Sequence, residues 1–367
     1  MIKISKVKAS EILSFADDSN FVGWEHIPIS LYRAISYSSN PRSNPDDIVL
    51  YLAFENEILI GYRTIMADLI HVADKEIKVG WLSGNWVLNK YRRKGIASLL
   101  LKEALKDWNN HLLYTNYALE SKAVYDKPDR FELLSTNPGQ RYYLRSCLAT
   151  LLPPRSVYFS KMKIVLKIVD GILNWINPLP LMATLGKEDH HISTGYLSQP
   201  DDFVHAMFES ECEATPTRRT RVELSWVLKF PWLVSSDLRR KEDKRYYFSS
   251  NPKRFEQLII KVCYSGTPIG FMVVNLIDDK LTVPYSAFSK NDSNHFAKIL
   301  LKHAAKLGVS MITIYESNLV SALNQRFLIK IFSKERYQNY FSTKEIANEL
   351  KSNVVIFRAG DGDCAFV

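Results

Sequence analysis

Residues 87–105 read VLNKYRRKGIASLLLKEAL, and this stretch decides how the chain is interpreted. An apolar strand ends here, a segment with three neighbouring cations and a glycine follows, and a leucine-rich helix begins after them. The first amides of a helix have no intrahelical partner and lie at the positive end of the helix dipole, so they bind anions. Glycine lets a phosphate approach the main chain closely. The stretch therefore predicts a diphosphate site, and a solvated basic turn is the alternative.

The composition bounds the class of protein. The 367 residues suffice for two domains, and 46% hydrophobic with 24% charged residues is typical of a folded globular chain. The net charge of +9 favours acidic partners such as CoA, nucleotides, anionic polymers or a membrane surface, although a basic excess also serves solubility. The four cysteines show no CxxC or His/Cys metal spacing, so we expect no metal and a cytoplasmic protein. We find no signal peptide and no membrane-spanning run.

Hydrophobic patterning predicts an α/β (α+β) fold with mixed, mostly antiparallel sheets flanked by helices. The first half shows a hairpin, a strand interrupted at Ser83-Gly84-Asn85, a helix, a strand and a short helix; these are residues 48–72, 78–88, 95–108, 112–119 and 120–127. The interruption suits a β-bulge. The second half repeats this order without residue identity, in residues 257–275, 280–288, 293–307, 310–315 and 318–326.

A helix near 160–176 connects the two halves. Its apolar residues fall at helical spacing, and Lys161, Lys163 and Lys167 lie along its start. A basic amphipathic helix of this kind can lie on a membrane surface. We favour the alternative, a connecting helix packed between two domains.

The quoted stretch resembles the acyl-CoA-binding motif of the GCN5-related N-acetyltransferase (GNAT) superfamily. In that motif a strand ending in Val-x-Pro precedes an Arg/Gln-x-x-Gly-x-Gly/Ala turn and an apolar helix. The matching positions are Val87, Asn89 in place of the proline, Arg92, Gly95 and Ala97. Residues 123–131, AVYDKPDRF, are similar to the family's tyrosine-bearing short helix, with one extra residue and no glycine.

The resemblance implies two GNAT-like domains in tandem. Residues 1–148 would form the catalytic, acyl-CoA-binding domain, residues 149–189 a linker with the amphipathic helix, and residues 190–367 a degenerate copy. The turn equivalent to the cation–glycine turn reads SKNDSNHFA at residues 289–297, without glycine and with little positive charge. We therefore expect the second copy not to bind CoA in the same way.

The resemblance also implies the chemistry, which is acyl transfer from acetyl-CoA or another acyl-CoA to a primary amine by direct attack in a ternary complex (an EC 2.3.1-type enzyme). It assigns cofactor binding to Val87, Leu88, Arg92, Arg93, Lys94, Gly95, Ile96 and Ala97. An N–H near Val87 or Leu88 would face the thioester oxygen, and Tyr125 would protonate the leaving thiolate. Strand 78–88 has no carboxylate, so we select Glu120 as the general base, ahead of Asp68 and His71.

The acceptor is left open by the sequence. Our hypothesis is that the acceptor is an amino sugar or sugar nucleotide in surface polysaccharide synthesis. It is based on aromatic residues that could line a sugar site, with the protein core as their alternative place: Trp24, Trp81, Trp86, Tyr142 and Tyr143. A peptide or protein lysine, and a relative that uses aminoacyl-tRNA as donor, are alternatives. The competing class is a non-catalytic acyl-CoA-binding or interaction protein on the same fold.

Other partners and motifs carry weaker predictions. We expect no nucleic-acid partner, because aromatic residues are not interleaved with basic runs. Peripheral membrane contact and the oligomeric state stay open. RRTR at residues 218–221 is interpreted as a solvated helix start, with contact to an anionic substrate as the alternative. GDGDCAF at residues 360–366 is interpreted as a tight turn before a last strand rather than a calcium loop, and His190-His191 as a loop.

Overall fold

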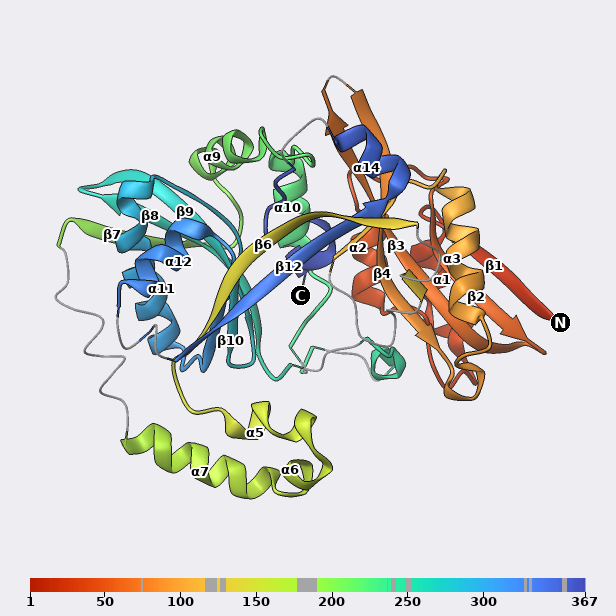
Figure 1. Ribbon diagram of the computed structural model, residues 1–367, viewed down its shortest axis with the longest axis horizontal. Helices are drawn as coiled ribbons and strands as arrows, with labels where there is room; N and C mark the ends of the chain where they lie inside the picture. Colours follow the sequence, from red (N-terminus) through yellow and green to blue (C-terminus); the bar gives the residue numbers. More distant parts are fainter. Residues whose placement is uncertain are drawn as a thin grey trace. The chain divides into compact units, whose positions relative to one another are not determined.

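The computed structural model describes residues 1–73, 75–115, 124–125, 130–176, 190–235, 237–238, 242–248, 252–326, 329, 332–351 and 355–366. The chain forms two compact units (Figure 1). The first unit comprises Met1–Asn137, Ser198–Phe255 and Gln338–Val367, and the second comprises Pro138–Leu197 and Glu256–Tyr337. These units differ from the expected ranges 1–148 and 190–367, because two later segments of the chain return to the first unit.

The first unit contains a mixed sheet in the order β1-β2-β3-β4-β5-β12. Its strands are β1 (Ile2–Lys8), β2 (Ile48–Glu55), β3 (Ile58–Val72), β4 (Lys75–Val87), β5 (Leu112–Thr115) and β12 (Ser333–Thr343), the last from Gln338 onward. The described pairs are antiparallel except β4–β5, which is parallel. Most of β2 and β3 is buried, because both faces of the sheet are covered.

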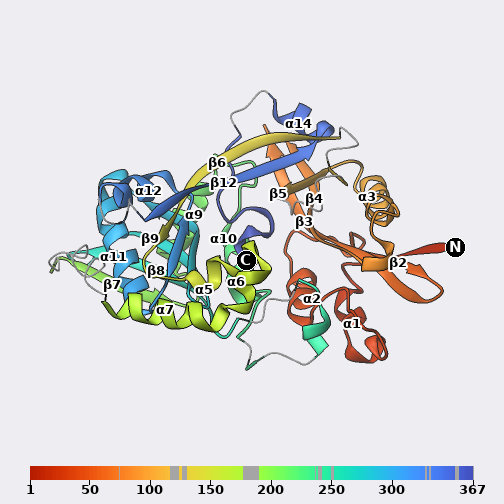
Figure 2. The ribbon, with the colours of Figure 1, turned by 60° about the horizontal axis from the view of Figure 1, so that its bottom comes forward.

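Helices cover both faces of this sheet. Figure 2 shows α3 (Ile96–Asp107) on one side of β2–β4, and α1 (Ile12–Phe15) and α2 (Leu31–Ser38) on the other. Further described helices of the unit are α9 (Asp202–Cys212), α10 (Arg221–Lys229), α14 (Lys344–Leu350) and the 3₁₀ helices η1 (Asp18–Phe21), η2 (Asn89–Tyr91), η5 (Glu242–Arg245) and η7 (Gly362–Phe366). Helix α3 packs so closely on β3 that a Cβ at Gly61 would lie 2.8 Å from Cγ2 of Ile96.

The second unit has its own sheet and core. Its strand order is β6-β11-β10-β9-β8-β7. The strands are β6 (Phe131–Tyr143, from Pro138 onward), β7 (Ile192–Leu197), β8 (Phe255–Tyr264), β9 (Thr267–Ile277), β10 (Lys280–Phe288) and β11 (Met311–Ile314). The helices are α5 (Leu148–Leu151), η4 (Pro153–Arg155), α6 (Val157–Lys161), α7 (Lys163–Ile176), η6 (Lys290–Asp292), α11 (Ser293–Lys306) and α12 (Ser317–Asn324). None of the described helices of the whole chain combines the length and apolar character that a membrane crossing requires.

The same succession of elements occurs in both units, as the sequence predicts. Strands β2, β3 and β4, helix α3 and strand β5 correspond to β8, β9, β10, α11 and β11. In β4, two residues including Ser83 lie opposite one residue of β3, since the register passes from Ile65↔Leu82 to Arg63↔Asn85. Strand β10 has an irregularity at the equivalent place, before its residue 285. Both the tandem fold and the bulge are confirmed.

Candidate functional site

The turn before α3 presents an open helix N-terminus. Arg93 (φ 64°) and Gly95 (φ 84°) both adopt left-handed backbone conformations. Gly95 is the N-cap of α3, no side chain caps the helix, and no acidic residue stands in its first turn. Arg92, Arg93 and Lys94 are exposed, and a Cβ at Gly95 would meet no atom within 4 Å. The turn therefore offers free space, three cations and helix-start amides to an anion.

This turn is held in place by its neighbours. Ile96 is buried against β3, and the hydroxyl of Tyr91 donates to Oε2 of Glu55 at 2.5 Å, which raises the pKa of Tyr91. The ammonium of Lys94 lies 5.0 Å from the centre of the Tyr91 ring. Leu88 donates its amide hydrogen to the carbonyl of Ile60 at 2.9 Å, so this amide, one of the two predicted to face a thioester, is engaged with β3.

A carboxylate lies where β4 and β5 separate. The last described pair between these strands joins Trp81 to Leu113. Two residues further along each strand, Ser83 and Thr115 both contact Asp363. The Ser83 hydroxyl donates to Oδ2 at 2.5 Å and the Thr115 hydroxyl donates to Oδ1 at 3.2 Å. The C-terminal segment therefore supplies the carboxylate that strand 78–88 lacks.

A buried cation stands behind this carboxylate. Nη2 of Arg33, on α2, donates to the Ser83 hydroxyl at 2.5 Å, and Nη1 donates to the hydroxyl of Tyr246 at 2.8 Å. Burial disfavours the charged guanidinium, but Tyr246, Tyr37 and Asp363 outweigh it and raise the pKa of Arg33. Ser83 thus connects a permanent positive charge to Asp363.

The two residues before Asp363 fix the C-terminal segment. Oδ1 of buried Asp361 accepts from the hydroxyl of Thr217 at 3.0 Å and from Nε of Arg219 at 3.1 Å. Gly362 (φ 68°) lies so close to Trp81 that a Cβ would come within 2.8 Å of the indole ring. The segment forms the 3₁₀ helix η7, so the predicted last strand is wrong. The described residues contain no group suited to a metal ion.

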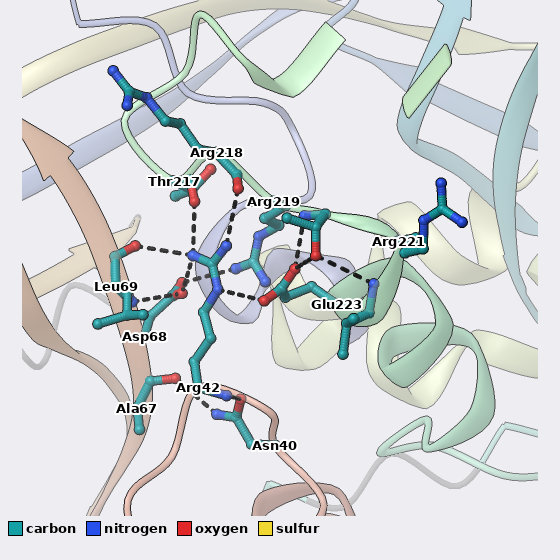
Figure 3. A network of polar contacts seen from close by, with 12 residues as sticks. Asn40, Arg42, Ala67, Asp68, Leu69, Thr217, Arg218, Arg219, Arg221 and Glu223 are labelled. Atoms are coloured by element: carbon teal, nitrogen blue, oxygen red, sulfur yellow. Dashed lines mark hydrogen bonds and ion pairs between the residues drawn. The ribbon is translucent and has the colours of Figure 1, made fainter. Parts of the chain in front are cut away.

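Asp68, considered from sequence as a base, is instead a structural anion (Figure 3). Its Oδ1 lies 2.9 Å from Nη1 of Arg42 and its Oδ2 lies 2.9 Å from Nη2 of Arg219. Burial alone would raise the pKa of Asp68, but Arg219 and Arg42 outweigh burial and lower it. Arg42 also binds Glu223 at 2.8 Å. For His71, burial and then Arg218 lower the pKa.

The expectation that RRTR at residues 218–221 is a solvated helix start is wrong in part, because one of its arginines is buried. Arg219 is almost fully buried between Asp68 and Asp361. Arg221, two residues later, is exposed and pairs with Glu209 at 3.2 Å. The helix start itself, with Thr220 as N-cap, is as predicted.

Tyr125 lies beside the end of β5. It is buried, its ring stacks on Tyr114 with 4.4 Å between centroids, and its hydroxyl accepts from Nη1 of Arg63 at 3.1 Å. Arg63 is fully buried, and within the described part of the chain its Nε and Nη2 have no hydrogen-bond partner. The hydroxyl of Tyr125 thus faces a buried cation with unused donors. Glu120 lies outside the described residues.

Most of the aromatic residues considered for a sugar site are buried in the core, Trp86 included. Trp81 and Tyr142 are buried core residues, and Trp24 packs against Phe21 and Phe54. Trp86 stacks on Tyr62, which stacks on Tyr246, the partner of Arg33. Sequence reasoning missed Arg33, Arg63, Thr115, Tyr246 and Asp363 as site residues. Only the paired aspartates of GDGDCAF gave a local signal, and it was interpreted as a turn.

Comparisons with known proteins bear on the same region. The model of the acetyltransferase (GNAT) family matches residues 10–126. A GCN5-related N-acetyltransferase from Anabaena variabilis is similar in structure, with a TM-score of 0.51 and 9% identity over 93% of this chain and 72% of that one. A probable N-acyltransferase from Enterococcus faecalis gives a TM-score of 0.50 and 10% identity over 94% and 72%. At such identities the likeness concerns the fold alone. No curated protein matches the sequence.

Proposed function

The chain belongs to the acetyltransferase (GNAT) family through residues 10–126, and from this premise we propose that it is an acyl-CoA-dependent N-acyltransferase. The proposed reaction moves an acetyl group from acetyl-CoA to a primary amine by direct attack in a ternary complex. The four cysteines are free thiols, which persist in a reducing compartment and support a cytoplasmic enzyme.

The observation that carries the proposal is the open, cationic turn before α3. Arg92, Arg93 and Lys94 are exposed there, and the space at Gly95 is free of protein atoms. These side chains and the amides up to Ala97 would hold the diphosphate of acetyl-CoA. When bound, acetyl-CoA supplies an activated thioester. Beyond Trp81, β4 still pairs with β3, but its edge on the side of β5 has no described strand partner. This edge would lie along the pantetheine arm.

We assign the acceptor side to Asp363. Its carboxylate takes the proton that the amine must lose as the new C–N bond forms, and the Ser83 hydroxyl, which accepts from Arg33, orients this carboxylate. On the leaving-group side, the hydroxyl of Tyr125 donates its proton to the departing sulfur. Arg63 offers its unused Nε and Nη2 donors to the negative charge that develops there. Glu120 stays the alternative base.

The second unit lacks the features of this donor site. Helix α11 begins at Ser293 with Asp292 as its N-cap. A carboxylate at a helix start occupies the place of an anionic ligand and repels a diphosphate. We therefore propose that this copy is degenerate and does not bind acyl-CoA as the first unit does.

An amino sugar or sugar nucleotide in surface polysaccharide synthesis is the acceptor we propose. Trp86, Tyr62 and Tyr246 form a stacked aromatic set, and Tyr246 contacts the same Arg33 that contacts Ser83. These three rings are buried, and the exposed rings next to them, Tyr247 and Phe248, offer aromatic faces that suit an amine on a sugar ring. The alternative is a non-catalytic acyl-CoA-binding or interaction protein, which would bind acyl-CoA without transferring the acyl group.

The test combines acetyl-CoA titration with an assay of free-thiol release over a panel of amino sugars, sugar nucleotides and lysine peptides. We expect thiol release with at least one amine, and about 10²-fold slower turnover in Asp363→Asn with unchanged acetyl-CoA affinity. Asp46→Asn, which changes an exposed carboxylate paired with Lys8, is the control. Binding without thiol release would favour the non-catalytic alternative. Full turnover in Asp363→Asn would remove Asp363 from the mechanism and direct the test to Glu120→Gln.

A further inference from the structure

Helix α7 exposes its apolar side chains to solvent. Ile164 is 75% exposed and Trp175 is 82% exposed. The other large apolar residues exposed on this helix are Val165, Ile168, Ile172 and Leu173. Ile164, Ile168, Ile172 and Trp175 recur at spacings of three and four residues, so they form one continuous stripe along the helix. A stripe of this kind normally faces a core.

The opposite side of α7 is anchored by polar contacts. One carboxylate, that of Asp170, accepts hydrogen bonds from the Ser146 hydroxyl at 2.6 Å and from the amides of Leu148 and Ala149 at 2.7 and 2.9 Å. Asn174 accepts from the amide of Ser146 at 2.7 Å and donates to its carbonyl at 2.9 Å. These bonds tie α7 to the start of α5, which lies alongside it (Figure 1). The helix is therefore held with its apolar stripe outward.

The charges around the stripe are of one sign. Arg155, Lys161, Lys163 and Lys167 are all exposed on η4, α6 and α7. Residues 148–176 contain a single acidic residue, Asp170, and its carboxylate is occupied by the start of α5. Helix α6 adds two more exposed apolar side chains, Val157 and Tyr158. The segment is thus an apolar stripe with cations on α6 and along one flank of α7, without an exposed anion of its own.

We propose that α6 and α7 form a membrane-docking surface that binds anionic phospholipid bilayers, with α7 lying in the plane of the interface. Ile164, Ile168 and Ile172 would enter the boundary between headgroups and acyl chains, and Trp175 would sit at headgroup depth. The lysines beside the stripe would contact the negatively charged lipid surface. This role is independent of the acyl-transfer activity.

The charge pattern decides between a bilayer and a second copy of the chain. In a symmetric dimer through α7, the same patch would face itself, and Lys161, Lys163 and Lys167 of both copies would be brought together without intervening acids. An anionic bilayer instead offers opposite charge over the whole border of the stripe. Charge complementarity therefore favours the lipid surface.

Vesicle sedimentation tests the proposal on the full-length protein. Vesicles of phosphatidylcholine alone are compared with vesicles containing about one third phosphatidylglycerol, at low and at high salt. The first variant is Ile168→Glu with Ile172→Glu, and the second replaces Lys161, Lys163 and Lys167 by glutamine. Val222→Glu is the matched control, because Val222 is an exposed apolar residue on helix α10 of the first unit. Thermal melts and size-exclusion with light scattering accompany each variant.

We expect binding to the anionic vesicles that weakens at high salt and is at least about tenfold weaker on phosphatidylcholine. Ile168→Glu with Ile172→Glu should weaken binding at least about tenfold. The triple glutamine variant should weaken binding by about fivefold for each of its three replaced lysines, and Val222→Glu should leave binding unchanged. Three results would overturn the proposal. These are no binding of the wild type, equal binding of the glutamate pair, or a wild-type dimer that the glutamate pair dissociates, which would assign the stripe to a second copy.

Discussion

Replacing Arg219 by methionine should destabilise the first unit strongly, although the sequence pattern around Arg219 is typical of a solvated helix start. Its guanidinium is 2.9 Å from Asp68 and 3.1 Å from Asp361, and all three side chains are almost fully buried. Asp68 keeps the ion pair with Arg42 in the variant, but from the described part of the chain Asp361 keeps hydrogen bonds only from the Thr217 hydroxyl and the Arg358 amide. Removing one partner of a buried ion pair costs about 3–5 kcal/mol, and we expect this loss in the free energy of unfolding.

The matched control is Arg221→Met, two residues away in the same stretch. Arg221 is 53% exposed and pairs with Glu209 at 3.2 Å, so its loss should change the free energy of unfolding far less than the loss of Arg219. Urea unfolding followed by tryptophan fluorescence compares the two variants, since Trp226 and Trp232 both lie in the first unit. If Arg219→Met were within about 1 kcal/mol of Arg221→Met, the buried network would not stabilise the unit as argued.

Three further predictions concern the same structure. First, the stability gap between wild type and Arg219→Met should narrow between pH 7 and pH 4 in urea unfolding. Burial raises the pKa of Asp361, so this carboxylate takes up a proton more readily in the folded state than in the unfolded state. The cost of leaving its charge without Arg219 in the variant therefore decreases as pH falls. The lowered pKa of Asp68 adds nothing within this window, since the stabilisation that Asp68 gains from Arg219 is lost only below its ordinary pKa of 3.8. Second, Tyr125→Phe should slow thiol release about 10²-fold without changing acetyl-CoA affinity, measured by titration; weakened affinity would indicate a packing role instead. Third, Asp170→Ala should expose α7 to limited proteolysis, because about 1–3 kcal/mol is lost with the hydrogen bonds to α5; unchanged cleavage would contradict that anchor.

The local parts of the site could be predicted from sequence because they depend on neighbours along the chain. Three cations, Gly95 and the leucines of α3 follow one another directly, and the bulge at Ser83 is signalled by the small and polar residues in an apolar strand. Helix starts and bulges are local devices, so their residue types mark them. The order of elements in both halves could be predicted for the same reason.

The acceptor side depends on contacts between distant segments. Asp363 reaches Ser83 across 280 residues, and nothing around either residue indicates which strand the C-terminal turn meets. Arg219 was assigned to the surface because arginine is rarely buried unless it is paired, and its two carboxylate partners lie far away in the chain. The unit boundaries were missed on the same ground, since residues 198–255 and 338–367 return to the first unit through tertiary contacts.

The donor-side proposal is that the turn before α3 holds the diphosphate of acetyl-CoA, and isothermal titration of acetyl-CoA into four proteins tests it. Wild type is compared with Gly95→Asp and Gly95→Asn. The Asp and Asn side chains have nearly the same shape, and both residues adopt the left-handed conformation found here (φ 84°) more readily than most other residues. Gly266→Asp, at the same φ in the second unit, controls for backbone strain.

We expect wild type and Gly266→Asp to bind acetyl-CoA with equal affinity. Gly95→Asn should bind more weakly, and Gly95→Asp more weakly still, because its carboxylate repels the diphosphate. Equal binding by wild type and Gly95→Asp, or no binding by wild type, would contradict the claim.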